Sequence, residues 1–443
     1  MSEDLASPHG SLMLSLKQNS SKKRNSSDFL NDIDVPVKRM KIYGQNLEII
    51  KKDDPRCHKI MDQVETNGYV LTYSQGNKAH PDWKESVSGQ NPTIINIVSM
   101  SQGRRHVVCL SDEGSVLTFG SNNEGALGRE VSEYGVTVPG FVHLPAPAIQ
   151  VTAGDTHSCA LLKDGRVYCW GSFQDSHGLL GLITGKQEIS PVNLEPGKRF
   201  TQIMSGADHI ILLDNTGTMF TLGCAEQGQL GRLPEKKTGR NSSRGKNSLL
   251  VPTPVQIKMK KNSLIKKIWA GRESSYAEDI HGNVFVFGNN YYGQLGLRKG
   301  GRIFWPQVVN TLSGYKWAKI TPPQRHNIHF AEKREVYILG KNMHTVLGLG
   351  TVKEDATEVV HVPTIRGTKC MDVAVGTAQS IAVTKTGKMY TWGTDSDKEF
   401  KTGKKNEVLK PQLISSELVK DFEFLLVSEL HDKDSDFCKI LLS

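Results

Sequence analysis

Histidines and aspartates stand together at the starts of several strand-like segments, where such pairs could act as a base, a metal site or a binding contact. Gly103-Arg104-Arg105-His106, Gly154-Asp155-Thr156-His157 and Gly206-Ala207-Asp208-His209 share a Gly-x-x-His pattern. A histidine repeated at one place in several units is more typical of a buried group whose ring nitrogens satisfy turn backbone than of a base or ligand. We therefore expect structural histidines here.

The residues beside these histidines differ from unit to unit. Asp155 and Asp208 are acidic, whereas Arg104, Arg105 and Arg325 stand at matching places elsewhere. Repeat scaffolds gather variable residues on one face to form a partner surface, so we expect these positions to bind a partner. The sequence shows no nucleophile context, no GxxxxGK[ST] phosphate loop and no metal-ligand spacing. We expect no catalytic residue, no metal and no cofactor.

The elements that would position these residues recur along the chain. Between Val151 and Leu182, two short apolar runs flank Lys163-Asp164-Gly165, which is a hairpin signature, and a glycine follows the second run. The same glycine closes six such units: Gly120, Gly171, Gly223, Gly288, Gly340 and Gly393. Successive gaps of 51, 52, 65, 52 and 53 residues, with a weaker copy at 68–76, indicate seven stacked units. Paired strands at this period predict an all-β, seven-bladed β-propeller.

The two ends of the chain differ from the repeats. Residues 1–45 lack periodicity and predict a disordered basic tail, which leaves 46–443 for the propeller. The runs 422–427 and 437–442 have no hairpin partner of their own, so we expect them to pair with the N-terminal strand and close the ring. Lys22, Lys23 and Arg24 precede Lys38, Arg39 and Lys41 in the form of a bipartite nuclear import signal.

Composition narrows the class further. The seven cysteines form no CxxC pair, which favours buried free thiols in a reducing compartment over disulfides or zinc. No run approaches the roughly 20 apolar residues of a membrane span, and the N-terminus lacks a signal-peptide core. We expect a soluble intracellular protein, a monomer with no membrane partner.

The charge is concentrated in one segment. The period from Gly223 to Gly288 is about 13 residues too long, and the excess falls in a polar loop insertion at 234–252. Residues 234–267 hold ten basic side chains against Glu235 alone, a balance equal to the formal net charge of +9 of the whole chain. Such a segment, which includes Lys236 and Lys237, is typical of a site for a polyanion or an acidic protein surface. A merely solvated loop is the alternative.

At these residues the chain resembles the regulator of chromosome condensation family, chromatin-bound exchange factors for the nuclear GTPase Ran. The resemblance covers about residues 66–420, and it is most specific at NNEGALGR (122–129), AGDTHSCALL (153–162), WGSFQDSHGLLGL (170–182) and CAEQGQLGRLPE (224–235). It implies a seven-bladed propeller with one face on the GTPase and the other on the nucleosome. Without covalent chemistry, such a protein accelerates nucleotide release by binding the nucleotide-free GTPase more tightly than the loaded form.

The resemblance also implies roles for particular residues. The loop from Ser172 to Gly181 matches the family's wedge, which pushes against the GTPase near its phosphate site. The wedge residues are Ser172, Phe173, Gln174, Asp175, Ser176, His177 and Gly178. Asp155, Asp208 and Arg232 match family residues that contact the GTPase, and Asp208 is the strongest candidate for exchange activity. Arg240 matches an arginine that enters the histone acidic patch of the nucleosome, and Arg244 lies one residue from another. The tail would add DNA contacts and bind importin.

Departures from the family leave two functions open. The family's first-unit aspartate is Asn77 here, and the sixth-unit histidine is Arg325, so the charges that a GTPase would meet have changed. The leading expectation is a nuclear, chromatin-bound exchange factor for Ran that supports nucleocytoplasmic transport and spindle and nuclear-envelope assembly. The alternative is a non-catalytic chromatin adaptor that has lost efficient exchange. A small-molecule enzyme lacks any reacting constellation.

Overall fold

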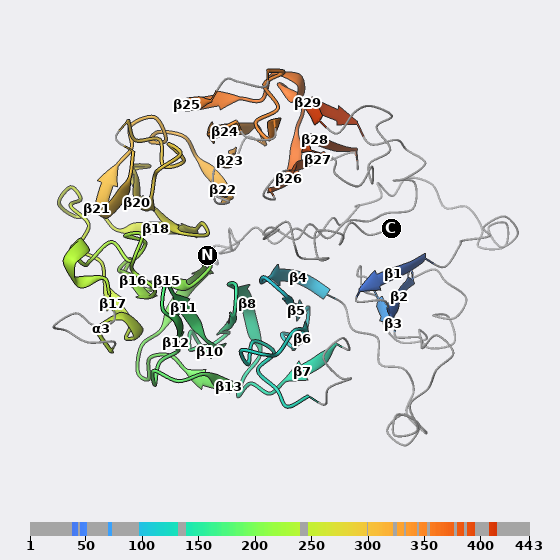
Figure 1. The fold of residues 1–443 in the computed structure, drawn as a ribbon, viewed down its shortest axis with the longest axis vertical. Coiled ribbons are helices and arrows are strands. Elements are labelled where there is room, and N and C mark those ends of the chain that lie inside the picture. Colours follow the sequence, from blue (N-terminus) through green and yellow to red (C-terminus); the bar gives the residue numbers. More distant parts are fainter. Residues whose placement is uncertain are drawn as a thin grey trace, which may run out of the picture.

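The computed structural model describes residues 38–42, 45–50, 70–72 and 97–413 of the chain, except for internal gaps. The gaps are 132–138, 240–246, 299, 322–325, 332–333, 343–344, 352–354, 376–378, 385–387 and 395–406. Only the backbone is described at 38–42, 45–50, 70–72, 247, 326–331, 371, 379 and 407. Six four-stranded antiparallel sheets dominate these residues and surround a common centre (Figure 1). The expectation of an all-β propeller is confirmed.

Each sheet is a meander of four strands. The first three contain β4 Ile97–Gln102, β5 His106–Ser111, β6 Val116–Gly120 and β7 Gly140–Val142; β8 Ala148–Ala153, β9 His157–Leu162, β10 Val167–Gly171 and β13 Glu188–Asn193; β14 Phe200–Ser205, β15 His209–Asp214, β16 Met219–Gly223 and β17 Thr253–Pro254. The next three contain β18 Ile265–Ala270, β19 Ser274–Asp279, β20 Val284–Asn289 and β21 Arg302–Val308; β22 Trp317–Thr321, β23 His326–Ala331, β24 Val336–Gly340 and β25 Ala356–His361; β26 Cys370–Val375, β27 Gln379–Thr384, β28 Met389–Thr394 and β29 Glu407–Leu413.

The remaining elements are short. A two-stranded hairpin of β11 Phe173–Asp175 and β12 Gly178–Gly181 interrupts the second sheet between β10 and β13. Helical segments in the described part of the chain are η2 Glu235–Lys237, α3 Asn247–Leu250 and η4 Pro363–Ile365. None of the described helices is long and apolar enough to cross a membrane.

A three-stranded sheet precedes the ring. It consists of β1 Lys38–Ile42, β2 Gln45–Ile50 and β3 Val70–Thr72. β1 and the start of β2 lie within residues 1–45, where we expected no strand. The stretch Arg39-Met40-Lys41-Ile42 alternates basic and apolar residues, a weak strand pattern that the basic composition obscured. The C-terminal runs 422–427 and 437–442, expected to close the ring, lie outside the described residues.

The core lies between neighbouring sheets. The innermost strands contact one another in the order β4, β8, β14, β18, β22 and β26. One cluster joins Cys159, Leu161 and Phe173 of the second sheet to Ile210 and Phe220 of the third. Because a single four-stranded sheet cannot cover both of its own faces, each sheet depends on its neighbours for burial. The five described cysteines that carry free thiols are all buried, at Cys109, Cys159, Cys169, Cys224 and Cys370.

The repeated glycines are required by close backbone approach. Gly171 has φ +92°, and an added Cβ would lie 2.3 Å from the carbonyl oxygen of Thr156. Its φ favours glycine, and the space beside it excludes any side chain. The other five unit-closing glycines share a positive φ. The repeat detected in the sequence is therefore a steric requirement at the end of each third strand.

Three Gly-x-x-His turns link the first four sheets in succession. His106 Nε2 lies 2.8 Å from Ser158 Oγ, His157 Nε2 lies 3.1 Å from Ser205 Oγ, and His209 Nε2 lies 3.0 Å from Ser275 Oγ. These histidines are buried, as expected, but these bonds reach serine hydroxyls of the next unit rather than backbone of their own turn.

Burial strongly favours the neutral rings. It lowers the pKa of His209 to about 3, and together with His106 and His209 it lowers the pKa of His157 well below 6.5. A protonated imidazole ring would be unfavourable at either position. His157 and His209 therefore act as structural links between sheets.

We expect Gly154→Ala to destabilise the ring. Its Cβ would lie 2.1 Å from His157 Cε1 and 2.4 Å from the Gly206 carbonyl oxygen, so the turn must move away from the next unit. Overpacking of this kind costs about 1–3 kcal/mol, measurable as a lower midpoint of thermal unfolding. Gly239→Ala is the control, because an added Cβ there has nothing within 4 Å. Equal midpoints for the two variants would contradict this role of Gly154.

Candidate functional site

The β11–β12 hairpin has a buried root and an exposed tip. Ser172 and Phe173 are fully buried, and the Phe173 ring packs edge-on against His157 with 4.7 Å between centroids. The Gly181 N–H donates to Ser172 Oγ at 3.1 Å and closes the base of the hairpin. Ser176, His177 and Gly178 are exposed, as is Leu179. The predicted wedge is therefore a defined projection on a fixed root.

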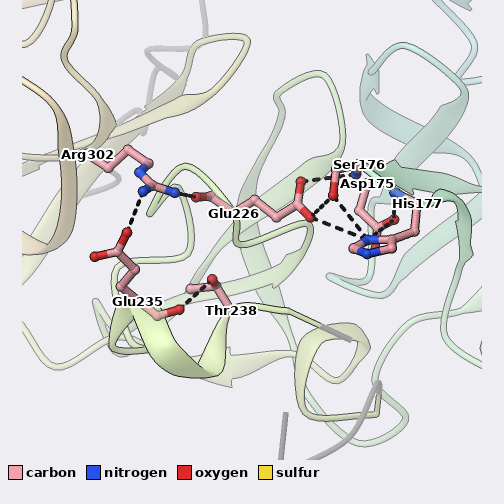
Figure 2. A network of polar contacts seen from close by, with 7 residues as sticks. All are labelled: Asp175, Ser176, His177, Glu226, Glu235, Thr238 and Arg302. Atoms are coloured by element: carbon pink, nitrogen blue, oxygen red, sulfur yellow. Dashed lines mark hydrogen bonds and ion pairs between the residues drawn. The ribbon is translucent and has the colours of Figure 1, made fainter. Parts of the chain in front are cut away.

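Two carboxylates of the following sheet hold this hairpin. Asp208 lies in the turn before β15, and its Oδ1 accepts the Gln174 N–H at 2.7 Å. Glu226 follows β16, and it accepts the Ser176 N–H at 3.0 Å and the Ser176 hydroxyl at 2.5 Å (Figure 2). The hairpin emerges from one blade but takes its orientation from the next.

Asp155 and Arg272 form an ion pair across the same side of the ring. The two guanidinium nitrogens Nη1 and Nη2 lie 2.9 and 2.6 Å from the two carboxylate oxygens of Asp155. Their turns are also joined through backbone, because Asp155 N–H donates to the Ala207 carbonyl and Ala207 N–H donates to the Arg272 carbonyl, each at 2.8 Å. Two Gly-x-x-His turns and the corresponding turn 271–274 of the next unit, which has serine in place of histidine, thus bring Asp155, Asp208 and Arg272 together.

Asp208 is poised between charge states. Its pKa is raised to about 7, chiefly by burial and also by the charge of Asp155, whereas the Gln174 N–H and Arg272 lower it. Burial opposes the charge of Arg272, but Asp155 outweighs it and raises the pKa of Arg272. Asp208 is thus a half-buried carboxyl whose ionisation is costly in the isolated protein.

Arg232 lies elsewhere and has an internal role. Its Nε donates to Thr221 Oγ1 at 3.1 Å, and its Nη2 donates to the carbonyl of Ser248 at 3.0 Å. Arg129 contacts Thr118 in the corresponding way, with its Nε 3.3 Å from Thr118 Oγ1. The pattern LGR therefore forms a repeated bond between a loop and the third strand of its sheet, and these bonds tie Arg232 to β16 and α3.

The basic segment begins at η2. Lys236 is exposed and Lys237 is half-buried, and Glu235 forms an ion pair with Arg302. Lys267 departs from the expectation of a solvated charge, because it is buried and its Nζ donates to the Trp317 carbonyl at 2.7 Å. Arg240 and Arg244 lie outside the described residues, as do Asn77, Arg325 and the cluster Lys22, Lys23 and Arg24. Lys38, Arg39 and Lys41 belong to β1, of which only the backbone is described.

Sequence reasoning missed Glu226 and Arg272. Arg272 follows the glycine of its turn as Asp155 does in its own, so the same comparison of turns could have identified it. Glu226 stands in a Gly-rich loop where other units have Asn123 and Tyr291, and nothing in the sequence joins it to the hairpin.

Asp175, His177 and Glu226 form a compact group that could hold a cation. One ligand atom from each lies within 4.8 Å of the other two. The carboxylates already have protein partners, however, since Asp175 Oδ1 accepts the His177 N–H at 2.8 Å and Glu226 binds Ser176. These contacts account for the arrangement without a metal.

Known proteins share this architecture. Residues 71–428 match the model of a family described as the RCC1-like domain. The regulator of chromosome condensation of Xenopus laevis is 35% identical over 372 residues, which cover 82% of this chain and 87% of that protein. The guanine nucleotide exchange factor SRM1 of Saccharomyces cerevisiae is 26% identical over 348 residues, covering 67% of this chain and 69% of that protein.

A solved structure has a similar fold. The crystal structure of Prp20p from Saccharomyces cerevisiae, described with its binding properties to Gsp1p and histones, matches with a TM-score of 0.65 and 25% identity. The match covers 76% of this chain and 81% of that one.

We expect Asp208→Asn to change how stability depends on pH. A carboxyl whose pKa is near 7 in the folded protein and near 4 in the unfolded chain stabilises the fold most at low pH. That contribution is lost as the pH rises from about 4 through 7. The asparagine keeps an acceptor for Gln174 but cannot ionise, so its stability relative to the natural protein should rise by about 1–3 kcal/mol from pH 5 to pH 7 and then level off. Thermal unfolding at pH 5, 6, 7 and 8 measures this, and a difference independent of pH would contradict it.

Proposed function

Since this chain belongs to the RCC1-like domain family, we propose that it is a guanine-nucleotide exchange factor for a Ran-type GTPase. One observation supports this above all. The β11–β12 hairpin projects beside the cluster of Asp155, Asp208 and Arg272, and its backbone N–H groups at Gln174 and Ser176 donate to the carboxylates of Asp208 and Glu226. A rigid projection next to ionisable groups suits the displacement of a bound nucleotide in a partner. A protein that exchanges nucleotides needs no reacting group of its own.

The hairpin would act by differential affinity. It adds binding energy only when the nucleotide site of the GTPase is open, so the complex with nucleotide-free GTPase is favoured over the loaded form. The buried Phe173 resists movement of the root, while the exposed Ser176, His177 and Gly178 meet the partner. Contacts between the tip and the GTPase therefore favour release of the nucleotide.

Asp155 and Asp208 would supply the electrostatic part of the affinity for the GTPase. Ionised Asp208 lies near Asp155 in a poorly hydrated place, so a cationic group of the GTPase would relieve a cost already present in the free protein. Arg272 holds Asp155 in place through two parallel bonds.

A seventh blade completes the proposal for the fold. The six described four-stranded sheets leave β1–β3 as part of the remaining blade, which the C-terminal runs 422–427 and 437–442 would complete. Closure of this kind removes the open edges of the first and last sheets.

The basic segment 234–267 and the N-terminal tail would bind chromatin. Exposed Lys236 and the excess of positive charge through 234–267 suit the acidic patch of histones, with Arg240 and Arg244 as the arginine contacts. The tail would contact DNA and carry the import signal read by importin, which places the protein in the nucleus on chromatin. There it would support nucleocytoplasmic transport and the assembly of spindle and nuclear envelope.

A non-catalytic chromatin adaptor is the second candidate. Asn77 and Arg325 change two charges of the family surface, and Arg232 bonds to Thr221 of its own sheet and to Ser248 of α3. An adaptor would retain the basic segment and bind the GTPase without accelerating nucleotide release.

Release of a fluorescent guanine nucleotide from purified Ran-type GTPase tests exchange. We expect the natural protein to accelerate release and Asp208→Ala to reduce that acceleration roughly tenfold or more, because it loses both the charge and the bond to Gln174. Asp208→Asn separates the two causes, since it can keep the bond but has no charge. No acceleration by a folded sample would favour the adaptor.

Nucleosome binding tests the proposed role of the basic segment 234–267. We expect Arg240→Ala combined with Arg244→Ala to weaken binding to nucleosomes but to leave binding to naked DNA largely intact. Lys260→Ala with Lys261→Ala is a matched control, because it removes the same charge from exposed positions of the same segment. An equal loss on both ligands would mean that the loop binds phosphate alone.

A further inference from the structure

Glu226 makes the contacts that orient the tip of the hairpin. Both of its carboxylate oxygens accept bonds from Ser176, one from the N–H at 3.0 Å and one from the hydroxyl at 2.5 Å. The two residues are 50 positions apart and belong to different blades. The side chain of Glu226 is 24% exposed, so it is more buried than the exposed tip that it holds.

The strands that lead to the tip are short. Each strand of the hairpin has only three or four residues, and an isolated two-stranded hairpin is marginally stable in water. The packing of Phe173 and the bond from Gln174 to Asp208 fix the root, but Ser176 to Leu179 are exposed. Beyond the root, Glu226 provides the described bonds from the neighbouring blade.

Glu226 is itself held from the far side. Arg302 donates through Nη1 to the Glu226 carbonyl oxygen at 3.2 Å, and its Nη2 pairs with Glu235 at the start of η2 (Figure 2). The Arg302 guanidinium also lies 5.7 Å from the centre of the Phe304 ring. Glu226 therefore acts from a braced loop and can impose its position on Ser176.

We propose that Glu226 is a positioning residue for nucleotide exchange, which acts through Ser176 to hold the hairpin tip in the orientation that meets the GTPase. The inference rests on the proposed function. Without Glu226, the tip samples many orientations, and each productive encounter must first select one of them. The loss of rate then occurs in the step in which nucleotide is displaced.

Three variants separate positioning from a direct charge contact. Glu226→Ala removes both acceptors. Glu226→Gln removes the charge but keeps an oxygen for the Ser176 N–H, while its amide N–H can donate to the rotated hydroxyl. Glu124→Ala is the control, since Glu124 lies in the corresponding loop of an earlier unit and no described hydrogen bond or ion pair involves it.

Two readouts are measured on the full chain. The first is hydrogen exchange of the amides in residues 172–181, and the second is the maximal rate of fluorescent nucleotide release from Ran-type GTPase, with its half-saturating concentration. We expect Glu226→Ala to accelerate hydrogen exchange at Ser176 about tenfold and to lower the maximal release rate by a similar factor, with little change in half-saturation. Glu226→Gln and Glu124→Ala should remain close to the natural protein in both.

The outcomes distinguish this inference from the proposed function. If the natural protein releases no nucleotide, the proposed function fails, and hydrogen exchange still decides whether Glu226 orders the tip. Natural protection of the tip in Glu226→Ala overturns the inference, as does natural release from a variant whose tip is mobile. Equal losses in Glu226→Gln and Glu226→Ala would also overturn it, in favour of a direct contact by the charge.

Discussion

The structure depends on the contact between the turn of one sheet and the next sheet in the ring. A glycine in each Gly-x-x-His turn lets the histidine ring and the following backbone approach closely, and the ring then reaches a serine of the neighbouring unit. These bonds lie in a water-poor interface, where a bond between neutral groups costs less to bury than a charged one. Because no sheet buries both faces alone, the ring is stable only when consecutive turns match.

The same turns carry the variable charges of the candidate site. Repetition fixes the backbone at Asp155, Asp208 and Arg272, so their side chains can change without altering the course of the chain. The burial that strengthens the ring is also the main cause of the raised pKa of Asp208, which is about 7. A group useful to a partner is thus destabilising in its absence, which is common where function and stability compete.

The repeats were predictable because each rests on local rules. Glycine at positive φ, tight hairpin turns and short apolar strands can each be recognised in the sequence from a few neighbouring residues. The acidic turns and the position of the loop at 172–181 were also predicted, the loop through the resemblance, but its two strands β11 and β12 were not. Glu226 was not, since its partner lies in another blade, and neither was the burial of Lys267, whose amine reaches a carbonyl 50 residues away. The internal bonds of Arg232 could have been inferred only by comparing it with Arg129 across two units.

The outer edge of the third sheet has a different consequence. β17 has two residues, lies at the outer edge of the third sheet (Figure 1) and is joined to β16 by the connection 224–252. The entropy of closing such a connection grows only slowly with its length. This rim is therefore the place where the chain tolerates growth, and an inserted module would leave the geometry around the axis unchanged. Evolution could acquire a new attachment surface there without redesigning the ring.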